Sequence, residues 1–246
     1  MRLTRIHVPG PLAAGGEVTL PVQAGEHLTR VLRLAAGAPF VMFDGSGGEY
    51  AAEIASTGKQ VRARVLRHDP VERESPLDIT LLQGVARGER MDLIVQKATE
   101  LGVARIVPVL TERSVVKVDA KQRERKRAHW QSIVVSACEQ CGRNRVPGVH
   151  DAVSLADALK LLPDGAMRCL LGADASEALA QAAARVTVAK LVLLIGPEGG
   201  LADHEEEYAQ AHGFISCRLG PRIMRTETAG LAALAALQTM AGDFSR

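Results

Sequence analysis

Two segments in the second half of the chain carry residues suited to chemistry at a ligand site. Residues 196–200 read Gly-Pro-Glu-Gly-Gly and directly follow an apolar run at 191–195. Glycines lack a side chain, so three of them let the backbone pass close to a ligand. The segment is not a phosphate loop, because the Gly-Lys-Ser/Thr ending is absent. It also lacks the G-x-G-x-x-G spacing of a dinucleotide-binding loop.

The second segment, residues 219–229, places Arg222, Arg225 and Glu227 between a predicted strand and a predicted helix. A purely structural interpretation is available, with Thr226 as the N-cap and Glu227 at the positive end of the helix dipole. A ligand-binding interpretation is also compatible with these residue types, although the segment alone favours the structural one. Taken alone, the segment leaves both open.

The elements that position these segments follow from the hydrophobic pattern. Short strands at 17–22, 38–44, 49–55 and 60–65, separated by Gly and Pro, predict a small β-rich unit, in which 44–48 is a hairpin turn. The polar stretch 68–76, framed by prolines, indicates a linker. We therefore predict one domain at 1–69 and a second at 77–246.

After residue 76, apolar strands alternate with helical patterns. The expected strands are 77–85, 103–110, 168–171, 191–195 and 214–219, and the expected helices are 91–101, a long helix around 130–141, 176–185, 203–212 and 226–241. This alternation predicts an α/β domain with a parallel sheet. Ligands of such sheets bind beyond the carboxyl ends of the strands, and both segments lie there.

Composition narrows the class of protein. The 246 residues are 47% hydrophobic and 24% charged, with a net charge of +2, which argues against a disordered or coiled-coil chain. The longest uncharged stretch, 228–242, is shorter than the roughly 20 apolar residues of a membrane helix. The first ten residues contain no continuous apolar run. We expect a cytoplasmic protein with free thiols and no membrane contact.

Two local patterns carry alternatives. Residues 113–145 hold nine Lys or Arg against three acidic residues, which suits either a phosphate-binding surface or a solvated helix face. Cys138 and Cys141 form a C-x-x-C, but both fall on the apolar stripe of the long helix. Cys169 and Cys217 are isolated, with no paired His to complete a zinc site. We therefore expect no metal.

Together, residues 195–200 and 219–229 closely resemble the bacterial 16S ribosomal RNA uracil-N3 methyltransferase family, a branch of the SPOUT superfamily. Residues 27–33, 44–50, 96–103 and 112–114 resemble other segments of that family, as do Glu139-Gln140 and Arg143. The resemblance covers nearly the whole chain.

This resemblance implies a PUA-like β-barrel at 1–69 for RNA recognition and a SPOUT-type α/β domain at 77–246 with a deep trefoil knot. It implies a homodimer that binds S-adenosylmethionine in the knot and acts on 16S ribosomal RNA or the small ribosomal subunit. The cofactor contacts that it implies are Leu171, Gly172, Gly196, Pro197, Glu198, Gly199, Gly200, Leu219, Gly220, Ile223, Met224 and Thr228.

The acceptor chemistry sets further expectations. Uracil N3 is mostly protonated near neutral pH, so the site must remove a proton or stabilise negative charge on the base. We expect Arg225 to stabilise the charge and Glu198 or Glu227 to take the proton. The basic residues expected on the RNA path are Arg30, Arg33, Arg113 and Arg143. A ribose 2′-O-methyltransferase of the same superfamily and a catalytically silent RNA-binding factor remain alternatives.

Overall fold

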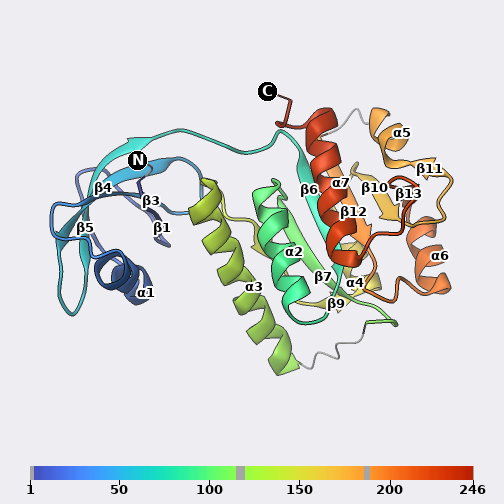
Figure 1. Ribbon diagram of the computed structural model, residues 1–246, viewed down its shortest axis with the longest axis horizontal. Helices are drawn as coiled ribbons and strands as arrows, with labels where there is room; N and C mark the ends of the chain where they lie inside the picture. Colours follow the sequence, from blue (N-terminus) through green and yellow to red (C-terminus); the bar gives the residue numbers. More distant parts are fainter. Residues whose placement is uncertain (1–2, 115–119, 186–188, 246) are drawn as a thin grey trace. The chain divides into compact units, whose positions relative to one another are not determined.

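The computed structural model describes residues 3–114, 120–185 and 189–245, and the chain divides into two compact units (Figure 1). Unit 1 comprises Met1–Glu74 and Val135–Val146, and unit 2 comprises Ser75–Val134 and Pro147–Arg246. The long helix α3 (Ala120–Cys141) therefore belongs partly to each unit. The domains proposed from the sequence differ from these units chiefly at 135–146, which the hydrophobic pattern of α3 could not separate from the rest of the helix.

Unit 1 contains a mainly antiparallel five-stranded sheet among its described residues, in the order β1-β3-β4-β5-β2. Its core is formed by Leu28, Phe40, Met42, Ile54 and other buried apolar side chains. The elements are β1 (Arg5–His7), β2 (Glu17–Thr19), α1 (Val22–Glu26), the π-helical turn η1 (His27–Val31), β3 (Pro39–Phe43), β4 (Glu49–Ser56) and β5 (Arg62–Asp69).

The expected strand at 17–22 is shorter than predicted, because β2 ends at Thr19 and α1 begins at Val22 after Pro21. Proline favours the start of a helix, where its missing N–H needs no partner. The apolar spacing at 22–31 was too irregular to indicate the helical segment. The polar stretch after Asp69 forms no helix or strand before β6 begins at Asp78, as a linker should.

Buried charges fasten residues 143–146 to the strands of unit 1. Arg5, only 7% exposed, pairs with Glu49 and donates to the side-chain oxygen of Asn144. Arg143, 6% exposed, donates from Nε to Glu74 Oε1 over 3.0 Å. A buried charge is strongly destabilising unless it is paired, so these contacts are needed for the stability of unit 1.

Unit 2 is built on a sheet of parallel strands in the order β11-β13-β10-β12-β6-β7-β8, with β9 also paired to β7. This confirms the α/β fold with a parallel sheet. The strands are β6 (Asp78–Gly84), β7 (Arg105–Leu110), β8 (Gly148–Val149), β9 (Val153–Ser154), β10 (Met167–Leu171), β11 (Glu177–Ala178), β12 (Lys190–Ile195) and β13 (Ile215–Arg218).

Helices cover both faces of this sheet. On one face, Val192 and Leu194 of β12 share a core with Leu155 of α4 and Ala209 of α6. On the other face, where Figure 1 shows α2 and α7 in front of the sheet, Gly230 of α7 lies against Leu81 and Ile195. The helices are α2 (Glu89–Glu100), α4 (Leu155–Lys160), α5 (Leu179–Ala184), α6 (Asp203–Ala211) and α7 (Thr226–Ala241).

Three further features of the described residues bear on the sequence predictions. The expected helix at 176–185 is a short strand, β11, followed by α5. Within the described part of the chain, no helix combines the length and apolarity needed to cross a membrane. Burial raises the pKa of Cys138 to about 12, so this thiol stays protonated. The threading of the chain through a knot stays a prediction of the resemblance.

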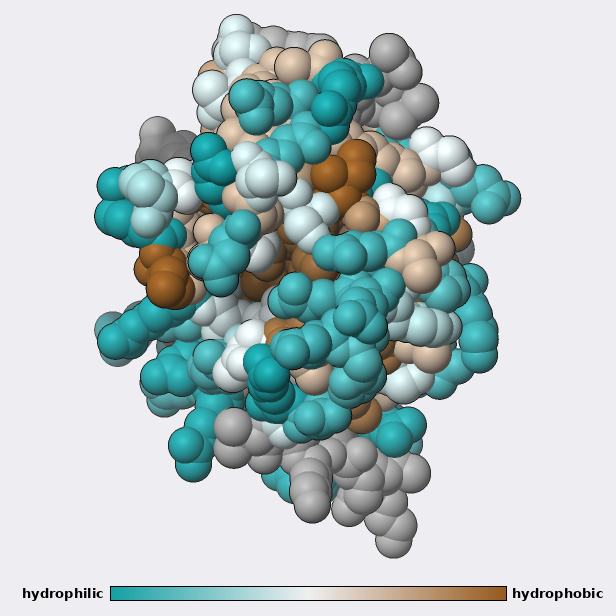
Figure 2. Space-filling model, turned by 90° about the vertical axis from the view of Figure 1, so that its right-hand side faces the viewer, coloured by the Kyte–Doolittle hydropathy of each residue, from teal (hydrophilic) through white to brown (hydrophobic). Residues whose placement is uncertain are grey.

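The surface of unit 2 on the side where α5, α6 and β11 lie is mostly hydrophilic (Figure 2). Its hydrophobic side chains form separate patches instead of one continuous area.

Candidate functional site

A cavity of about 440 Å³ lies beyond the carboxyl ends of β10 and β12, between the 196–200 loop and the start of α7. A smaller hollow of about 90 Å³ shares Leu171, Gly172 and Met224 with it and extends toward Leu219 and Gly220. The larger volume lies within the roughly 300–1,000 Å³ typical of small-molecule sites. The cavity therefore has room for a small organic ligand at the position expected for a parallel sheet.

Close backbone packing holds the 196–200 loop in place. A Cβ atom on Gly84, at the end of β6, would lie 2.5 Å from the nitrogen of Pro197, so only glycine fits there. A Cβ on Gly196 would lie 3.0 Å from the backbone of Gly200 and Leu201. The loop therefore folds back on itself directly above the end of β6.

Thr226 joins three parts of the site through a buried chain of hydrogen bonds. Gln83 of β6 donates from Nε2 to Thr226 Oγ1 over 2.9 Å, and Thr226 donates to the carbonyl of Gly196 over 2.6 Å. Gln83 is fully buried and Thr226 is 6% exposed. The N-cap of α7 is Arg225, whose backbone is extended, so the prediction of Thr226 as the N-cap was wrong. The Thr226 hydroxyl bonds the Gly196 carbonyl instead.

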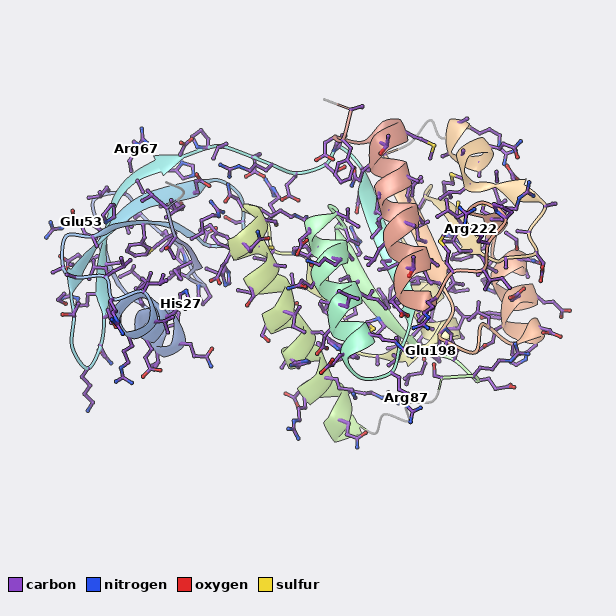
Figure 3. All side chains as sticks on the ribbon, in the orientation of Figure 1. His27, Glu53, Arg67, Arg87, Glu198 and Arg222 are labelled. Carbon is purple, nitrogen blue, oxygen red and sulfur yellow. The ribbon has the colours of Figure 1, made fainter. Side chains whose placement is uncertain are left out.

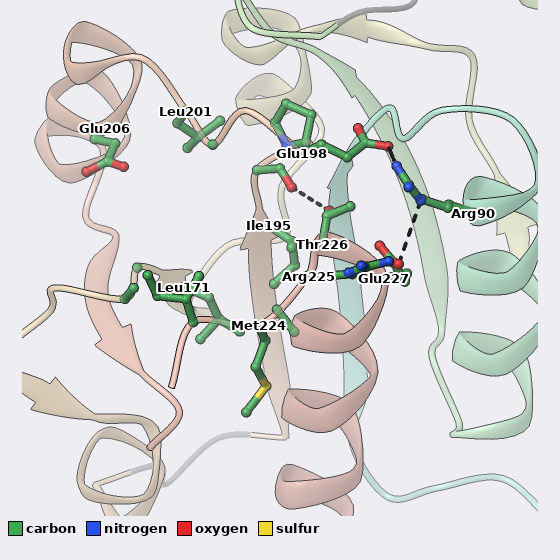
Figure 4. Close-up of a pocket in the computed structure, with 17 residues that line it drawn as sticks. Arg90, Leu171, Ile195, Glu198, Leu201, Glu206, Met224, Arg225, Thr226 and Glu227 are labelled. Carbon is green, nitrogen blue, oxygen red and sulfur yellow. Dashed lines mark hydrogen bonds and ion pairs between the residues drawn. The ribbon is translucent and has the colours of Figure 1, made fainter. Parts of the chain in front are cut away.

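Charged side chains gather on one side of the cavity (Figure 4). Glu198 Oε1 accepts from the backbone N–H of Arg87 over 2.9 Å and from Arg90 Nη1 over 2.8 Å. Figure 3 shows Arg87 and Glu198 at the same end of the sheet. Burial raises the pKa of Glu198, but these two donors outweigh it, so the pKa lies below its ordinary value. Glu198 is therefore a carboxylate with little tendency to take a proton.

Glu227 and Arg225 are less fully engaged. Glu227 Oε1 lies 3.7 Å from Arg90 Nε, and its Oε2 is buried without a hydrogen-bond partner among the described residues. Arg225 lines the cavity, is exposed, and forms no ion pair with any residue that the structure describes. These two groups keep hydrogen-bonding capacity that a ligand could use.

Most of the expected cofactor residues lie around the two hollows. Gly199 and Thr228 are the exceptions: Gly199 packs against the side chain of Arg113, and Thr228 is exposed on α7. The expected residues that line the hollows are Leu171, Gly172, Gly196, Pro197, Glu198, Gly200, Leu219, Gly220, Ile223 and Met224. The three expected catalytic residues, Arg225, Glu198 and Glu227, line the larger one.

The four arginines expected on the RNA path have different environments. Arg30 and Arg33 are exposed in unit 1, and Arg30 pairs with Glu26 one helical turn away. Arg113 donates to the carbonyl of Leu201 over 2.8 Å, so it stabilises the end of the 196–200 loop.

Arg143 corrects the sequence prediction. Its guanidinium is buried in unit 1 and paired with Glu74, so it is not presented to a ligand. A basic residue in a polar sequence context gave no signal of this burial, because its partner lies 69 residues away.

Four residues that line the cavity lie outside the segments that the sequence indicated as ligand-binding: Arg90, Ala173, Leu201 and Glu206. Arg90 reaches Glu198 across 108 residues of sequence, which no local motif reveals. Glu206 lies in the first turns of α6, seven residues beyond Gly199, and looked like an ordinary helix-surface acid. The only available signal was proximity in sequence: Leu201 and Glu206 follow the 196–200 loop closely, whereas Arg90 adjoins neither loop.

Comparisons with known proteins agree on one family. The model of the RNA methyltransferase domain matches residues 73–238, and that of the RNA methyltransferase PUA domain matches residues 20–66. The N-terminal PUA assignment is thereby confirmed.

Curated relatives include two ribosomal RNA small subunit methyltransferases E. That of Bacillus subtilis is 34% identical over 219 residues, covering 86% of this chain and 85% of the relative. That of Buchnera aphidicola subsp. Schizaphis graminum is 31% identical over 245 residues, covering 99% of each chain.

Solved structures extend the likeness to the whole fold. A proposed methyltransferase from Legionella pneumophila, in complex with the bound cofactor SAM, superposes with a TM-score of 0.93 at 39% identity. The match covers 99% of this chain and 100% of the other. The ribosomal RNA small subunit methyltransferase E of Neisseria gonorrhoeae, bound to S-adenosyl methionine, superposes with a TM-score of 0.90 at 38% identity. This match covers 99% of this chain and 100% of the other. The chain therefore belongs to the ribosomal RNA small subunit methyltransferase E family.

Proposed function

We propose that this protein transfers a methyl group from S-adenosylmethionine to N3 of a uridine in 16S ribosomal RNA. The observation that carries the proposal is the cavity at the ends of β10 and β12, in a chain whose relatives of 38–39% identity were solved with this cofactor bound. The resemblance to the uracil-N3 family supports the choice of acceptor atom.

The cavity suits the cofactor in size and lining. Apolar side chains of Leu171, Ile195 and Met224 alternate with backbone of the glycine loop, as an adenosine with a charged tail requires. Leu219 and Gly220 extend the apolar part into the smaller hollow. When bound, the sulfonium cofactor supplies an activated methyl group, so the protein mainly has to orient the acceptor and exclude water.

The charged residues on one side of the cavity have different roles in the methylation of the acceptor. Glu198 is held by Arg87 and Arg90 with a lowered pKa, so it positions Arg90 and does not act as the base. Glu227 keeps an oxygen without a partner among the described residues, so it is the better acceptor for the N3 proton. Arg225, without an ion pair there, stabilises the negative charge that develops on the uracil oxygens.

RNA reaches this site as an unpaired or flipped nucleotide, because N3 is engaged in a base pair within a duplex. Arg30 and Arg33 of unit 1 and the exposed basic face of α3 supply phosphate contacts. That face comprises the exposed Arg123, Arg125 and Arg127 and the half-buried Lys126, although Arg127 also pairs with Asp151. Arg143 has no part in this surface.

The protein works as a homodimer in this proposal. Ile223, at the rim of the cavity, is 87% exposed, and a partner subunit is the natural cover for such a side chain. The half-buried residues on the outer face of α7, including Leu231 and Ala235, add apolar surface. Sedimentation over a dilution series tests this, and a monomer at every concentration would contradict it.

The decisive experiment is methylation of 16S ribosomal RNA and of small ribosomal subunits with labelled S-adenosylmethionine, followed by nucleoside analysis. We expect N3-methyluridine. Recovery of 2′-O-methylated nucleosides would identify a ribose methyltransferase instead. RNA binding without cofactor binding would identify a silent RNA-binding factor. An Arg225→Ala variant serves as the matched control for background methylation.

A further inference from the structure

Glu206 is a carboxylate on the wall of the cavity that the acceptor chemistry does not use. It lies on α6, and Figure 4 shows it on the side of the cavity away from Arg90, Arg225 and Glu227. It forms no ion pair or side-chain hydrogen bond with any residue that the structure describes. Glu205, its neighbour, differs: that side chain accepts from the backbone of Ala202 and Glu112.

The surroundings of Glu206 favour a cation. Asp203 and Asp174 add negative charge nearby. Among the described residues, the positive group that acts on Glu206 is Arg113, which already pairs with Asp203 and donates to the carbonyl of Leu201. Burial, followed by the charge of Asp203, raises the pKa of Glu206 above its ordinary value. A positive ligand group beside Glu206 would relieve both effects, because it favours the ionised carboxylate.

We propose that Glu206 binds the α-ammonium group of the cofactor's methionine tail and thereby fixes which end of the cavity the tail occupies. This inference rests on the proposed function. The tail then points toward α6, while the apolar hollow by Leu219 and Gly220 takes the adenine. The methyl group is left facing the side with Arg225 and Glu227, where the acceptor must enter. Glu206 is thus a positioning and specificity residue.

Three thioether ligands isolate the interaction, because none carries the sulfonium charge. S-adenosylhomocysteine has the ammonium and the carboxylate, its deamino analogue has only the carboxylate, and 5′-methylthioadenosine has neither. Their affinities for the full-length wild type, Glu206→Gln and Glu207→Gln are measured by calorimetry. Glu207 is exposed on the same helix and does not line the cavity, so it is the matched control.

We expect Glu206→Gln to lower the affinity for S-adenosylhomocysteine by about tenfold. A loss of this size is typical of a lost hydrogen bond between charged groups. Its affinities for the deamino analogue and for 5′-methylthioadenosine should match those of the wild type. Glu207→Gln should leave all three unchanged. An equal loss for all three ligands in Glu206→Gln, or no loss for S-adenosylhomocysteine, would overturn the inference alone. No binding of any ligand by the wild type would overturn the proposed function with it.

Discussion

The buried arginines of unit 1, Arg5 and Arg143, are paired with carboxylates. The cavity of unit 2 combines the paired side chains Arg90, Glu198 and Glu227 with charged side chains that have no ion pair among the described residues. In unit 1, Arg5 and Arg73 share Glu49, and Arg143 is paired with Glu74. Around the cavity, Arg225 and Glu206 have no ion pair with any residue that the structure describes. Charges that satisfy one another stabilise a fold, whereas a charge left facing a cavity is available to a ligand. Substitutions of paired and of unpaired charges should therefore differ in whether they change stability or activity.

The largest effect should come from Arg143→Ala, which leaves Glu74 without its buried partner. We expect a loss of about 3 kcal/mol in the free energy of unfolding, measured by urea denaturation. Arg145→Ala is the control, since its ion pair with Glu72 is largely exposed and should contribute less than about 1 kcal/mol. Similar losses in the two variants would mean that the burial of Arg143 does not matter.

Arg225→Ala tests the other side of the contrast. Turnover should fall about 100-fold, because in the proposed reaction the charge on the uracil develops mainly in the transition state. Cofactor affinity and the free energy of unfolding should stay nearly constant. Single-turnover methylation and calorimetry on the same preparation separate the two. Lys160→Ala, on the exposed surface of α4, is the control. A fall in cofactor affinity that accounts for the whole loss would reassign Arg225 to binding.

The sequence predicted the two loops that form this site but not which charged side chains pair with one another there. The apolar run of β12 followed by glycines and the strand before α7 located both loops, because hydrophobic pattern and glycine content are local properties. Arg90 was missed and Arg143 misassigned for one reason: a charge's role depends on whether a partner meets it in the fold. Those partners, Glu198 and Glu74, are 108 and 69 residues away. Elements of two or three residues, such as β1, β8 and β9, were also too short for periodicity to reveal.

Thr226→Val sharpens the contrast with a neutral group. The variant loses the hydrogen bond to the Gly196 carbonyl and leaves Gln83 Nε2 without its partner at Thr226, so we expect about 2 kcal/mol of destabilisation. Cofactor affinity should fall too, because the glycine loop loses its tie to α7. Thr226→Ser keeps the hydroxyl, so its free energy of unfolding and its cofactor affinity should be close to those of the wild type. Failure of serine to restore them would point to the methyl group as the important part.

The smallest effect concerns acid pH and Glu49. Burial raises the pKa of Glu49, but hydrogen bonds from Arg73 and Arg5 outweigh it, so the pKa lies below the ordinary 4.5. A lowered pKa gives stability that is fully present above about 4.5 and is lost as the pH falls through the folded-state value. The stability advantage of wild type over Glu49→Gln should therefore shrink below pH 4.5 in urea titrations. A constant difference at all pH values would contradict the assignment.

The sharing of α3 between the units has a consequence for synthesis on the ribosome. The chain emerges from its N-terminus, yet Met1–Glu74 lacks Val135–Val146, the segment that completes unit 1. Until Asn144 has been translated, Arg5 has no amide to receive its hydrogen bond. The N-terminal unit therefore cannot finish folding before Ser75–Val134 of unit 2 has been synthesised. A nascent chain stalled between residues 74 and 135 would therefore carry an N-terminal unit that has not finished folding.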